Sequence, residues 1–277
     1  MNMNQREDRF IKTVKDFYKK QGRHDLPWRK TKDPYRILVS EIMLQQTQVE
    51  RVIPKYKDFI KKWPTAAELA KASLGGVLKE WQGLGYNRRA KMLYQTAKAV
   101  AGTCQSTCQQ KFPQSNDELK ELPGIGPYTA GAVMAFAYNK PMPIIETNIR
   151  TAFLHHFFKN QSDVDDTAIM RLVERTLDQK NPREWYWALM DYGTHLKKEF
   201  GNPNKKSKHY AKQSKFAGSD RQIRGAIVRA LSRGQASKAK LRKDLIAFDT
   251  KRVEAQMQKL LAEGMVIKKG RSFSLPE

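Results

Sequence analysis

The chain has 277 residues, of which 52 are Lys or Arg and 28 are Asp or Glu, so its formal net charge is +24 at pH 7. A charge excess of this size favours a polyanionic partner such as a nucleic acid. Hydrophobic residues make up 40% and charged residues 29% of the sequence, which excludes a chain that is disordered throughout. The sequence shows neither an apolar run that could span a membrane nor a secretory signal, so we expect a cytoplasmic protein that contacts no membrane.

The first part of the chain, up to about residue 196, is predicted to be helical. Apolar residues recur at helical spacing at Phe10, Val14 and Phe17, and apolar positions continue through residues 37–53 and 69–78. Patterns that alternate as in a strand are scarce there. The sequence therefore predicts a mainly α-helical protein.

The last third of the chain is its more basic part, with 21 Lys or Arg against 7 Asp or Glu in residues 194–277. Residues 197–216 (KKEFGNPNKKSKHYAKQSKF) combine seven lysines with Gly, Pro, Asn and Ser and lack apolar periodicity. This composition predicts an irregular basic linker between a first domain at residues 1–196 and a second at residues 217–277.

The segment after this linker has the pattern of three helices and a hairpin. Apolar stripes run over residues 223–231, 241–245 and 253–261, and alternation around a Lys-Gly turn follows in residues 265–275. This order is typical of a winged helix, so we predict a small winged-helix-like, DNA-binding domain.

Candidate metal ligands are few. Cys104 and Cys108 are too few for a disulfide framework or a four-thiolate site; one local bridge is possible, but two free thiols in a reducing cytosol are the favoured interpretation. The adjacent His155 and His156 lack the i, i+4 spacing of a helical metal pair. We therefore expect no metal site.

The segment Glu121–Gly131 (ELPGIGPYTAG) carries the sharpest local motif. The pair Gly124 and Gly126 ahead of a helix of small residues forms a tight turn whose bare N–H groups can hold a phosphate. An ordinary helix–helix turn is the alternative. The LPGIG sequence in a basic chain favours a helix-hairpin-helix DNA clamp.

Two carboxylates have unusual surroundings. Glu41 lies within the apolar stretch Ile37–Leu44, and Glu146 follows Pro143-Ile-Ile. Cleavage of a glycosidic bond needs an acid for the leaving group and a negative group beside the developing oxocarbenium ion, and burial raises the pKa of an acid as that role requires. From composition alone, a structural carboxylate, or a helix cap at Glu146, stays open as the alternative.

Polar residues follow Glu41 at Gln45, Gln46, Thr47 and Gln48. Amide side chains can replace base–base hydrogen bonds in a duplex from which an enzyme has extruded a base. From these residues alone, a polar helix surface is the simpler interpretation.

Several motifs together resemble one family. They are Leu26–Arg29 (LPWR), Ser40–Val49 (SEIMLQQTQV), Gly83–Tyr86 (GLGY), Leu122–Ala132 (LPGIGPYTAGA) and Asn148. In order and spacing they resemble the A/G-specific adenine DNA glycosylases of the endonuclease III superfamily, over about residues 8–195. The resemblance implies a fold of two helical lobes with the active site in the cleft between them.

The resemblance also implies catalytic roles. Glu41 would protonate N7 of a flipped adenine, and Glu146 would occupy the place of the family aspartate that stabilises or traps the oxocarbenium ion. Tyr128 and Asn148 would orient this chemistry. Bifunctional members of the superfamily carry a lysine at the position of Tyr128, whose amine forms a Schiff base that leads to strand cleavage; tyrosine cannot form it, so the implied product is an uncut abasic site.

DNA-contacting roles follow in the same way. Trp28, Arg29 and Asp191 would line the base pocket. Gln46 would wedge into the gap left by the base, with Tyr86 inserted on the lesion side. The full predicted set of DNA-binding residues is Gln45, Gln46, Thr47, Gln48, Tyr86, Leu122, Gly124, Ile125, Gly126 and Thr129.

Three departures from the family bear on function. Glu146 replaces an aspartate, and the extra methylene moves the carboxylate by about 1.5 Å, a displacement that can cost about a hundredfold in rate. Lys197 and a cysteine-free segment stand where the family usually has the four cysteines of an iron–sulfur cluster, so we expect no cluster and no other cofactor. Residues 217–277 do not resemble the family's domain that senses 8-oxoguanine, which leaves recognition of the opposite base open.

We therefore expect a monomeric, monofunctional DNA glycosylase of base excision repair, associated with the nucleoid if the source is bacterial. Its partner would be double-stranded DNA with an adenine opposite 8-oxoguanine or guanine. One alternative is another target base, such as T or U opposite G, or 8-oxoguanine. A second is a catalytically silent DNA-binding protein, which the Glu146 exchange favours and the acid Glu41 opposes.

Overall fold

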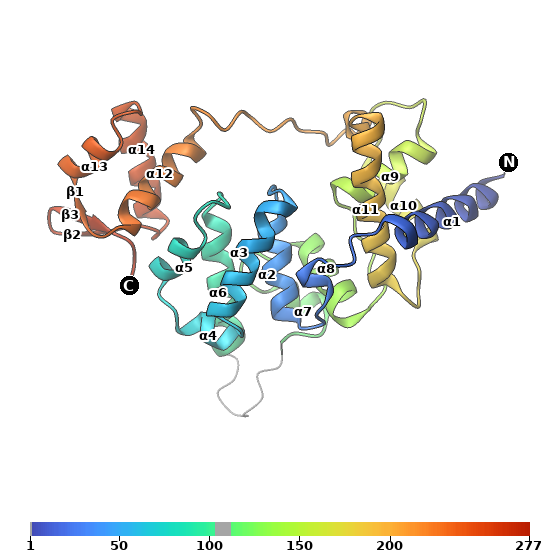
Figure 1. Ribbon diagram of the computed structural model, residues 1–277, viewed down its shortest axis with the longest axis horizontal. Coiled ribbons are helices and arrows are strands. Elements are labelled where there is room, and N and C mark those ends of the chain that lie inside the picture. Colours follow the sequence, from blue (N-terminus) through green and yellow to red (C-terminus); the bar gives the residue numbers. More distant parts are fainter. Residues whose placement is uncertain (1, 103–111) are drawn as a thin grey trace. The chain divides into compact units, whose positions relative to one another are not determined.

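The computed structural model describes residues 2–102 and 112–277 (Figure 1). Cys104 and Cys108 lie outside the described residues. The chain divides into two compact units. The first unit consists of Met1–Leu38, Pro113–Glu121 and Ile125–Lys212, and the second of Val39–Phe112, Leu122–Gly124 and Gln213–Glu277.

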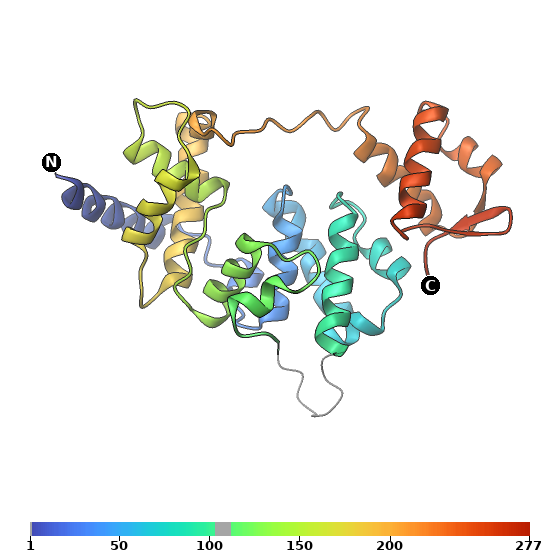
Figure 2. The same ribbon diagram turned by 180° about the vertical axis from the view of Figure 1, so that it is seen from behind.

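The first unit is built from helices around an aromatic core. Its helices are α1 (Met3–Gln21), α7 (Asn116–Lys120), α8 (Pro127–Tyr138), α9 (Thr147–Phe157), α10 (Asp166–Thr176), α11 (Pro182–Phe200) and the first residues of α2 (Pro34–Leu44). Helices α9 and α11 lie side by side (Figures 1 and 2). The ring of Phe10 lies 4.9 Å from that of Phe153 and 6.1 Å from that of Trp185. All three are buried, and each contributes about 1.5–3 kcal/mol through removal from water.

Helix α8 is apolar on every side. Its sequence, PYTAGAVMAFAY, is buried from Thr129 to Ala137, and a Cβ at Gly131 would lie 2.5 Å from Ile144. A helix that is hydrophobic all round belongs inside a protein rather than on its surface. Burial of α8 therefore fixes the position of its N-terminus, which follows the Gly-x-Gly turn.

The second unit begins with the end of α2 and continues through four helices. They are α3 (Val49–Lys62), α4 (Ala66–Lys71), α5 (Leu74–Glu80) and α6 (Arg88–Gly102). The ring of Phe59 lies 6.0 Å from that of Trp81, and both are fully buried with Leu93. This core holds the end of α2 and the loop between α5 and α6 in place.

Residues 220–277 of the second unit form what we call the C-terminal module. It contains α12 (Asp220–Ser232), α13 (Lys238–Asp244) and α14 (Thr250–Ala262), with the strands β1 (Ala236–Ser237), β2 (Ile267–Lys269) and β3 (Ser272–Ser274). The strands are antiparallel in the order β1-β3-β2, and Lys268 pairs with Phe273. The three helices and the hairpin predicted from the sequence are present. Strand β1 was not predicted, because two residues are too few to show alternation.

The C-terminal module packs against α5. The backbone N–H of Gly75 donates to the carbonyl oxygen of Pro276 at 2.8 Å. A Cβ at Gly75 would lie 2.3 Å from this oxygen, so the contact requires glycine. Within the second unit, the module therefore contacts α5 and also α6, where Lys91 donates to the carbonyl oxygen of Glu263. The domain boundaries given from the sequence stay a prediction.

The structure differs from the predicted irregular linker in its first half. Helix α11 continues to Phe200, and a 3₁₀ turn at Pro203–Lys206 packs on α9. Asn204 is buried there and its amide donates to Thr151 Oγ1 at 2.7 Å. Residues 210–218 are exposed. The sequence did not predict the end of α11, because Leu196 is the last buried residue of the helix and the residues after it are rich in lysine. They therefore show no apolar periodicity.

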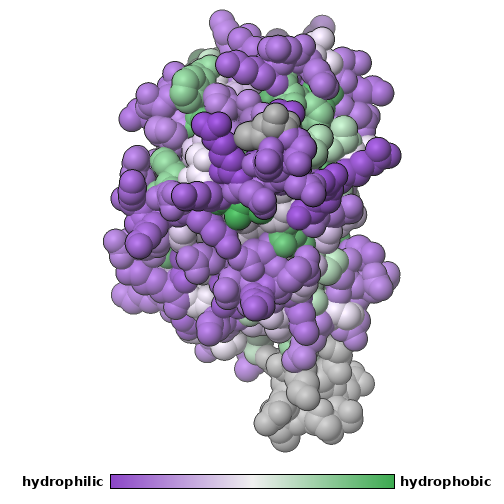
Figure 3. Space-filling view, turned by 90° about the vertical axis from the view of Figure 1, so that its right-hand side faces the viewer, coloured by the Kyte–Doolittle hydropathy of each residue, from purple (hydrophilic) through white to green (hydrophobic). Residues whose placement is uncertain are grey.

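Among the described residues, no helix is both long enough and apolar enough to cross a membrane. Figure 3 shows a face of the molecule that is largely hydrophilic, with hydrophobic residues in small scattered groups. A surface of this kind suits a charged partner better than an apolar one.

Candidate active site and nucleic-acid interface

The predicted hairpin lies between α7 and α8. Gly124 has φ +76°, a conformation that side chains disfavour, and a Cβ there would lie 2.5 Å from Met92. Thr96 Oγ1 donates to the carbonyl oxygen of Pro123 at 2.7 Å and holds the turn. Gly126 is the N-cap of α8 and has open space around its Cβ position. The turn therefore exposes bare backbone at a helix N-terminus, as binding of a phosphate requires.

The other predicted hairpin residues differ in exposure. Gly126 is exposed, Leu122 is partly buried, and Ile125 and Thr129 are buried. A contact of Thr129 with DNA would therefore come from its backbone rather than its side chain. Ile125 anchors the turn in the protein.

Helix α2 carries Glu41 and ends beside the four polar residues. Glu41 is buried, with 8% of its surface exposed, as the prediction of an acid in an apolar segment requires. Gln46 is exposed and has φ +54°. A positive φ in a non-glycine residue is held only where the surrounding structure determines it. The preceding residue, Gln45, is held through its carbonyl oxygen by Arg89 of α6.

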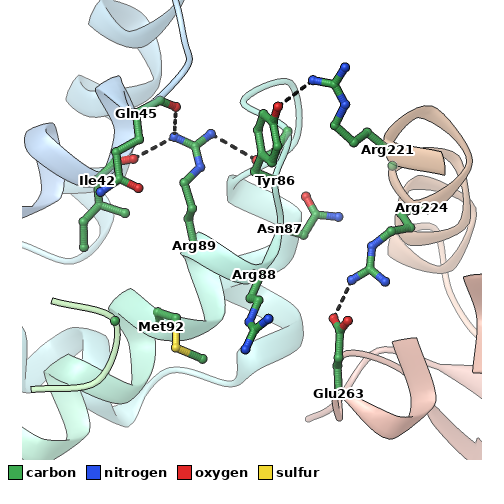
Figure 4. Close-up of a pocket in the computed structure, with 13 residues that line it drawn as sticks. Ile42, Gln45, Tyr86, Asn87, Arg88, Arg89, Met92, Arg221, Arg224 and Glu263 are labelled. Atoms are coloured by element: carbon green, nitrogen blue, oxygen red, sulfur yellow. Dashed lines mark hydrogen bonds and ion pairs between the residues drawn. The ribbon is translucent and has the colours of Figure 1, made fainter. Parts of the chain in front are cut away.

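Arg89 joins two loop tips. Its guanidinium donates to the carbonyl oxygens of Ile42 at 2.7 Å and of Gln45 at the end of α2, and to those of Leu84 at 3.0 Å and Gly85 at 3.2 Å (Figure 4). A cation is favourable at this helix C-terminus because the last carbonyl groups lack partners in the helix. Burial lowers the pKa of Arg89 to about 10, so it stays charged at neutral pH.

The second loop tip is Tyr86. Gly83 and Gly85 have φ +94° and +72°, and Tyr86 itself has φ +47°. The ring of Tyr86 lies 5.5 Å from the guanidinium of Arg89. The structure therefore brings together Gln46 and Tyr86, the two residues predicted to enter the duplex, on loops fixed by the same arginine.

In the first unit, Glu146 is the N-cap of α9. Its Oε1 accepts from the backbone N–H of Asn148 at 2.6 Å and of Ile149 at 2.8 Å, and its Oε2 accepts from Asn148 Nδ2 at 3.2 Å. Burial raises the pKa of Glu146, partly offset by the N–H of Ile149 and by the charge of Lys197. The helix-cap role considered from the sequence is thus present, and it also holds the carboxylate in one orientation.

Lys197 of α11 completes this group. Its Nζ donates to Asn148 Oδ1 at 2.8 Å, so the amide of Asn148 must direct its NH₂ at Glu146. Burial lowers the pKa of Lys197. Close packing makes the contact possible, since a Cβ at Gly193 would lie 2.0 Å from the carbonyl oxygen of Asn148. Lys197 lies in the segment predicted to be a linker, and the lysine-rich composition there did not reveal this role, although its place after the Asp191 segment was a usable signal.

The predicted base-pocket residues meet in a buried ion pair. Arg29 donates to both carboxylate oxygens of Asp191, at 2.8 and 2.9 Å, and Arg23 adds bonds from its backbone N–H and its Nε. Burial alone would raise the pKa of Asp191, but the bonds and charges of Arg29 and Arg23 outweigh it and lower that pKa. Trp28 is buried beside them in the chain. These residues therefore have a structural role, and their role in a base pocket stays a prediction. The remaining predicted catalytic residue, Tyr128, is partly exposed in the first turn of α8.

Comparisons with known proteins place this geometry in a family. The model of the HhH-GPD superfamily base excision DNA repair proteins matches residues 39–179. An adenine DNA glycosylase of Mycolicibacterium smegmatis is 32% identical over 277 residues, which cover 88% of each chain. The chain belongs to the HhH-GPD superfamily. An adenine DNA glycosylase of Buchnera aphidicola (Baizongia pistaciae) is 38% identical over 192 residues, and there this HhH-GPD chain spans about half of the relative's length, 52%.

Solved structures agree with the fold. A thermostable thymine-DNA glycosylase is 27% identical, with a TM-score of 0.60 over 69% of this chain and 87% of that chain. A non-covalent endonuclease III–DNA complex is 19% identical, with a TM-score of 0.52 over 71% of this chain and 86% of that chain. The second likeness bears on fold alone. The predicted mainly helical HhH glycosylase fold is therefore confirmed.

The Arg29–Asp191 pair generates a stability prediction. Asp191→Asn leaves two arginines facing a neutral amide in a buried site, so we expect the free energy of unfolding to fall by about 3–5 kcal/mol, measured by urea denaturation at pH 7. Because the pKa of Asp191 is lowered in the folded state, wild type should lose this contribution as pH falls through that pKa. Asp25→Asn, in an exposed pair with Lys30, is the control and should change stability little; equal effects of the two variants would contradict the assignment.

Proposed function

We propose that this HhH-GPD protein is a monofunctional DNA glycosylase that removes adenine mispaired with 8-oxoguanine or guanine. The curated relatives named adenine DNA glycosylase support the choice of base. The observation that best supports a glycosylase reaction is the fixed orientation of the Glu146 carboxylate. Asn148 and the start of α9 hold it, and Lys197 contacts Asn148 in the same group. In its ionised form, a carboxylate fixed in this way supplies the negative group that an oxocarbenium-like transition state requires.

In the proposed reaction, Glu41 donates a proton to N7 of the flipped adenine, which weakens the bond between N9 and C1′ of the sugar. The bond breaks with its electron pair on adenine, and positive charge develops on the sugar. The carboxylate of Glu146 stabilises that charge, and water adds to C1′ and loses a proton. The products are free adenine and an abasic site.

The side chain at position 128 determines whether the strand is also cut. A Schiff base at C1′ needs an amine, and Tyr128 offers a phenol at the start of α8. We therefore propose that the abasic strand stays intact.

We further propose that the protein acts without the iron–sulfur cluster of its relatives. A cluster of this kind needs four thiolates, and the chain has two cysteines, Cys104 and Cys108, both before the Asp191 segment. The donor set does not fit the group. Among the described residues, no group of three or more His, Cys, Asp or Glu is arranged to hold a metal ion.

A second candidate function is removal of a pyrimidine opposite guanine. The likeness to a thymine-DNA glycosylase, 27% identical with a TM-score of 0.60, and the glutamate at position 146 favour it. The pocket would then accept a smaller base, and Glu146 would keep the same role toward the sugar.

One assay separates these functions. Wild-type protein is incubated under single-turnover conditions with duplexes that carry A opposite 8-oxoguanine, A opposite G, T opposite G, U opposite G, or 8-oxoguanine opposite C. Alkali then cleaves abasic sites. We expect cutting only in the strand that carries adenine. Cutting only in a strand that carries T, U or 8-oxoguanine would show that the protein removes that base instead. No cutting in any duplex would show that the protein binds DNA without excising a base.

Glu41→Gln tests the proposed acid. Loss of a general acid lowers the rate by about 10²–10⁴-fold, while affinity for the duplex should change little because Glu41 is buried. Glu50→Gln, at an exposed position of α3, is the matched control and should keep the wild-type rate. Full activity of Glu41→Gln would mean that another group protonates the base.

Lys197→Met tests whether the charge of Lys197 opposes the rise in the pKa of Glu146 that burial causes. Lys197 lowers the pKa of Glu146, as Arg150 also does, so removal of the Lys197 charge should raise that pKa. Since the proposed reaction needs the carboxylate, the acid limb of the pH–rate profile should move to higher pH.

Two further variants control this experiment. Lys197→Arg keeps the charge and should restore the limb, and Lys198→Met, at the exposed neighbouring position of α11, should leave it in place. A rate that falls equally at every pH, with no movement of the limb, would show that Lys197 is only structural.

A further inference from the structure

A pocket of about 430 Å³ lies in the second unit, beside the two loop tips (Figure 4). The C-terminal module supplies one of its walls. The lining residues that matter here are Ile42, Tyr86, Met92, Arg221 and Arg224.

Two side chains from beyond α11 reach the loop tips at this pocket. Arg221, in the first turn of α12, donates from Nη1 to the hydroxyl of Tyr86 at 2.6 Å, and its guanidinium lies 5.2 Å from the centre of that ring. Gln213 donates from Nε2 to Gln46 Oε1 at 3.0 Å and also to the hydroxyl of Tyr86. The residues predicted to enter the duplex are thus in contact with the chain segment that precedes and begins the C-terminal module.

The pocket offers both donors and apolar surface. Arg221 directs its other amino group at Ser214, at 2.6 Å from the carbonyl oxygen and 3.1 Å from Oγ, which fixes the plane of its guanidinium. Arg224 is paired with Glu263. The ring of Tyr86 and the side chains of Ile42 and Met92 form an apolar side of the pocket. The face of a base can pack against such a surface, whereas a phosphate gains nothing from it.

We propose that this pocket binds the base opposite the excised one and that Arg221 determines its identity. The inference rests on the proposed function, because Gln46 and Tyr86 stand beside the opposite base only if they fill the gap left by a flipped one. The ligand class is a purine that presents two hydrogen-bond acceptors on its major-groove edge. Guanine presents O6 and N7 there, and a planar arginine contacts such a pair with two N–H groups. In 8-oxoguanine N7 carries a hydrogen, and O6 and O8 are the acceptors to which the N–H groups of Arg221 would donate.

The partners that hold Arg221, the hydroxyl of Tyr86 and the backbone and side chain of Ser214, compete only weakly with a base. A hydroxyl and an exposed backbone carbonyl are neutral acceptors, so the guanidinium can exchange them for a base without breaking an ion pair. Arg224, by contrast, would have to leave the carboxylate of Glu263. Gln213, on the exposed segment, supplies a second adaptable donor and acceptor.

The test compares excision of adenine opposite 8-oxoguanine, guanine, and a tetrahydrofuran that lacks a base. The measured quantity is the ratio of the single-turnover rate opposite each purine to the rate opposite tetrahydrofuran. Arg221→Leu should lower this ratio about tenfold or more, the loss of one good arginine–base contact. Arg221→Lys keeps the charge without the planar fork and should lower the ratio nearly as much, with the salt dependence of DNA binding unchanged.

Arg229→Leu, at an exposed position of the same helix, is the matched control and should keep the wild-type ratio. If Arg221→Leu slows all three substrates equally and flattens the salt dependence, Arg221 contacts a phosphate and the proposal is overturned. A wild-type ratio close to one, or a ratio unchanged in both Arg221 variants, overturns it as well.

Failure of the proposed function gives a different result. In that case wild type excises adenine from none of the duplexes. Equilibrium binding to the same three duplexes then still tests the pocket: a preference for the purines that Arg221→Leu abolishes supports it, and equal affinities overturn it.

Discussion

The guanidinium of Arg89 binds the carbonyl end of α2 and the carbonyl groups before Tyr86 at the same time. One partly buried cation thereby binds the C-terminal end of the helix that carries Glu41 and holds two loops whose tips, Gln46 and Tyr86, have positive φ. Neutral side chains could not satisfy so many carbonyl oxygens, because arginine alone offers five donors in a plane. Both the proposed duplex wedge and the pocket at Arg221 depend on this arrangement.

A second constraint operates at Glu146. Its carboxylate is held at three points: two backbone N–H groups of α9 and the amide of Asn148. Lys197 orients that amide and supplies positive charge. Glu146 and Lys197 are therefore parts of one group.

Local sequence patterns predicted the features that depend on local geometry. The spacing of Gly124 and Gly126 predicted the hairpin, and the apolar neighbours of Glu41 predicted its burial. The apolar stripes after residue 217 predicted the helices of the C-terminal module. Each of these rests on spacing within one element.

Contacts between distant segments could not be predicted in this way. Arg29 and Asp191 are 162 positions apart and 135 positions separate Tyr86 from Arg221, so no periodicity connects them. Lysine-rich composition made Lys197 look like part of a linker, although its side chain turns back to Asn148. Such partners emerge only once the packing of helices is known, because ion pairs and amide contacts follow from tertiary neighbours.

We propose that this HhH-GPD protein releases adenine by hydrolysis without a metal cluster. The most direct measurement combines mass spectrometry of the released base with gel analysis of the unheated, alkali-free DNA strand, on purified protein whose iron content is determined. We expect free adenine from a duplex with adenine opposite 8-oxoguanine, an intact strand, and no stoichiometric iron. Strand cleavage without alkali, release of another base, or activity that rises with the bound iron content would show that the proposed reaction is wrong.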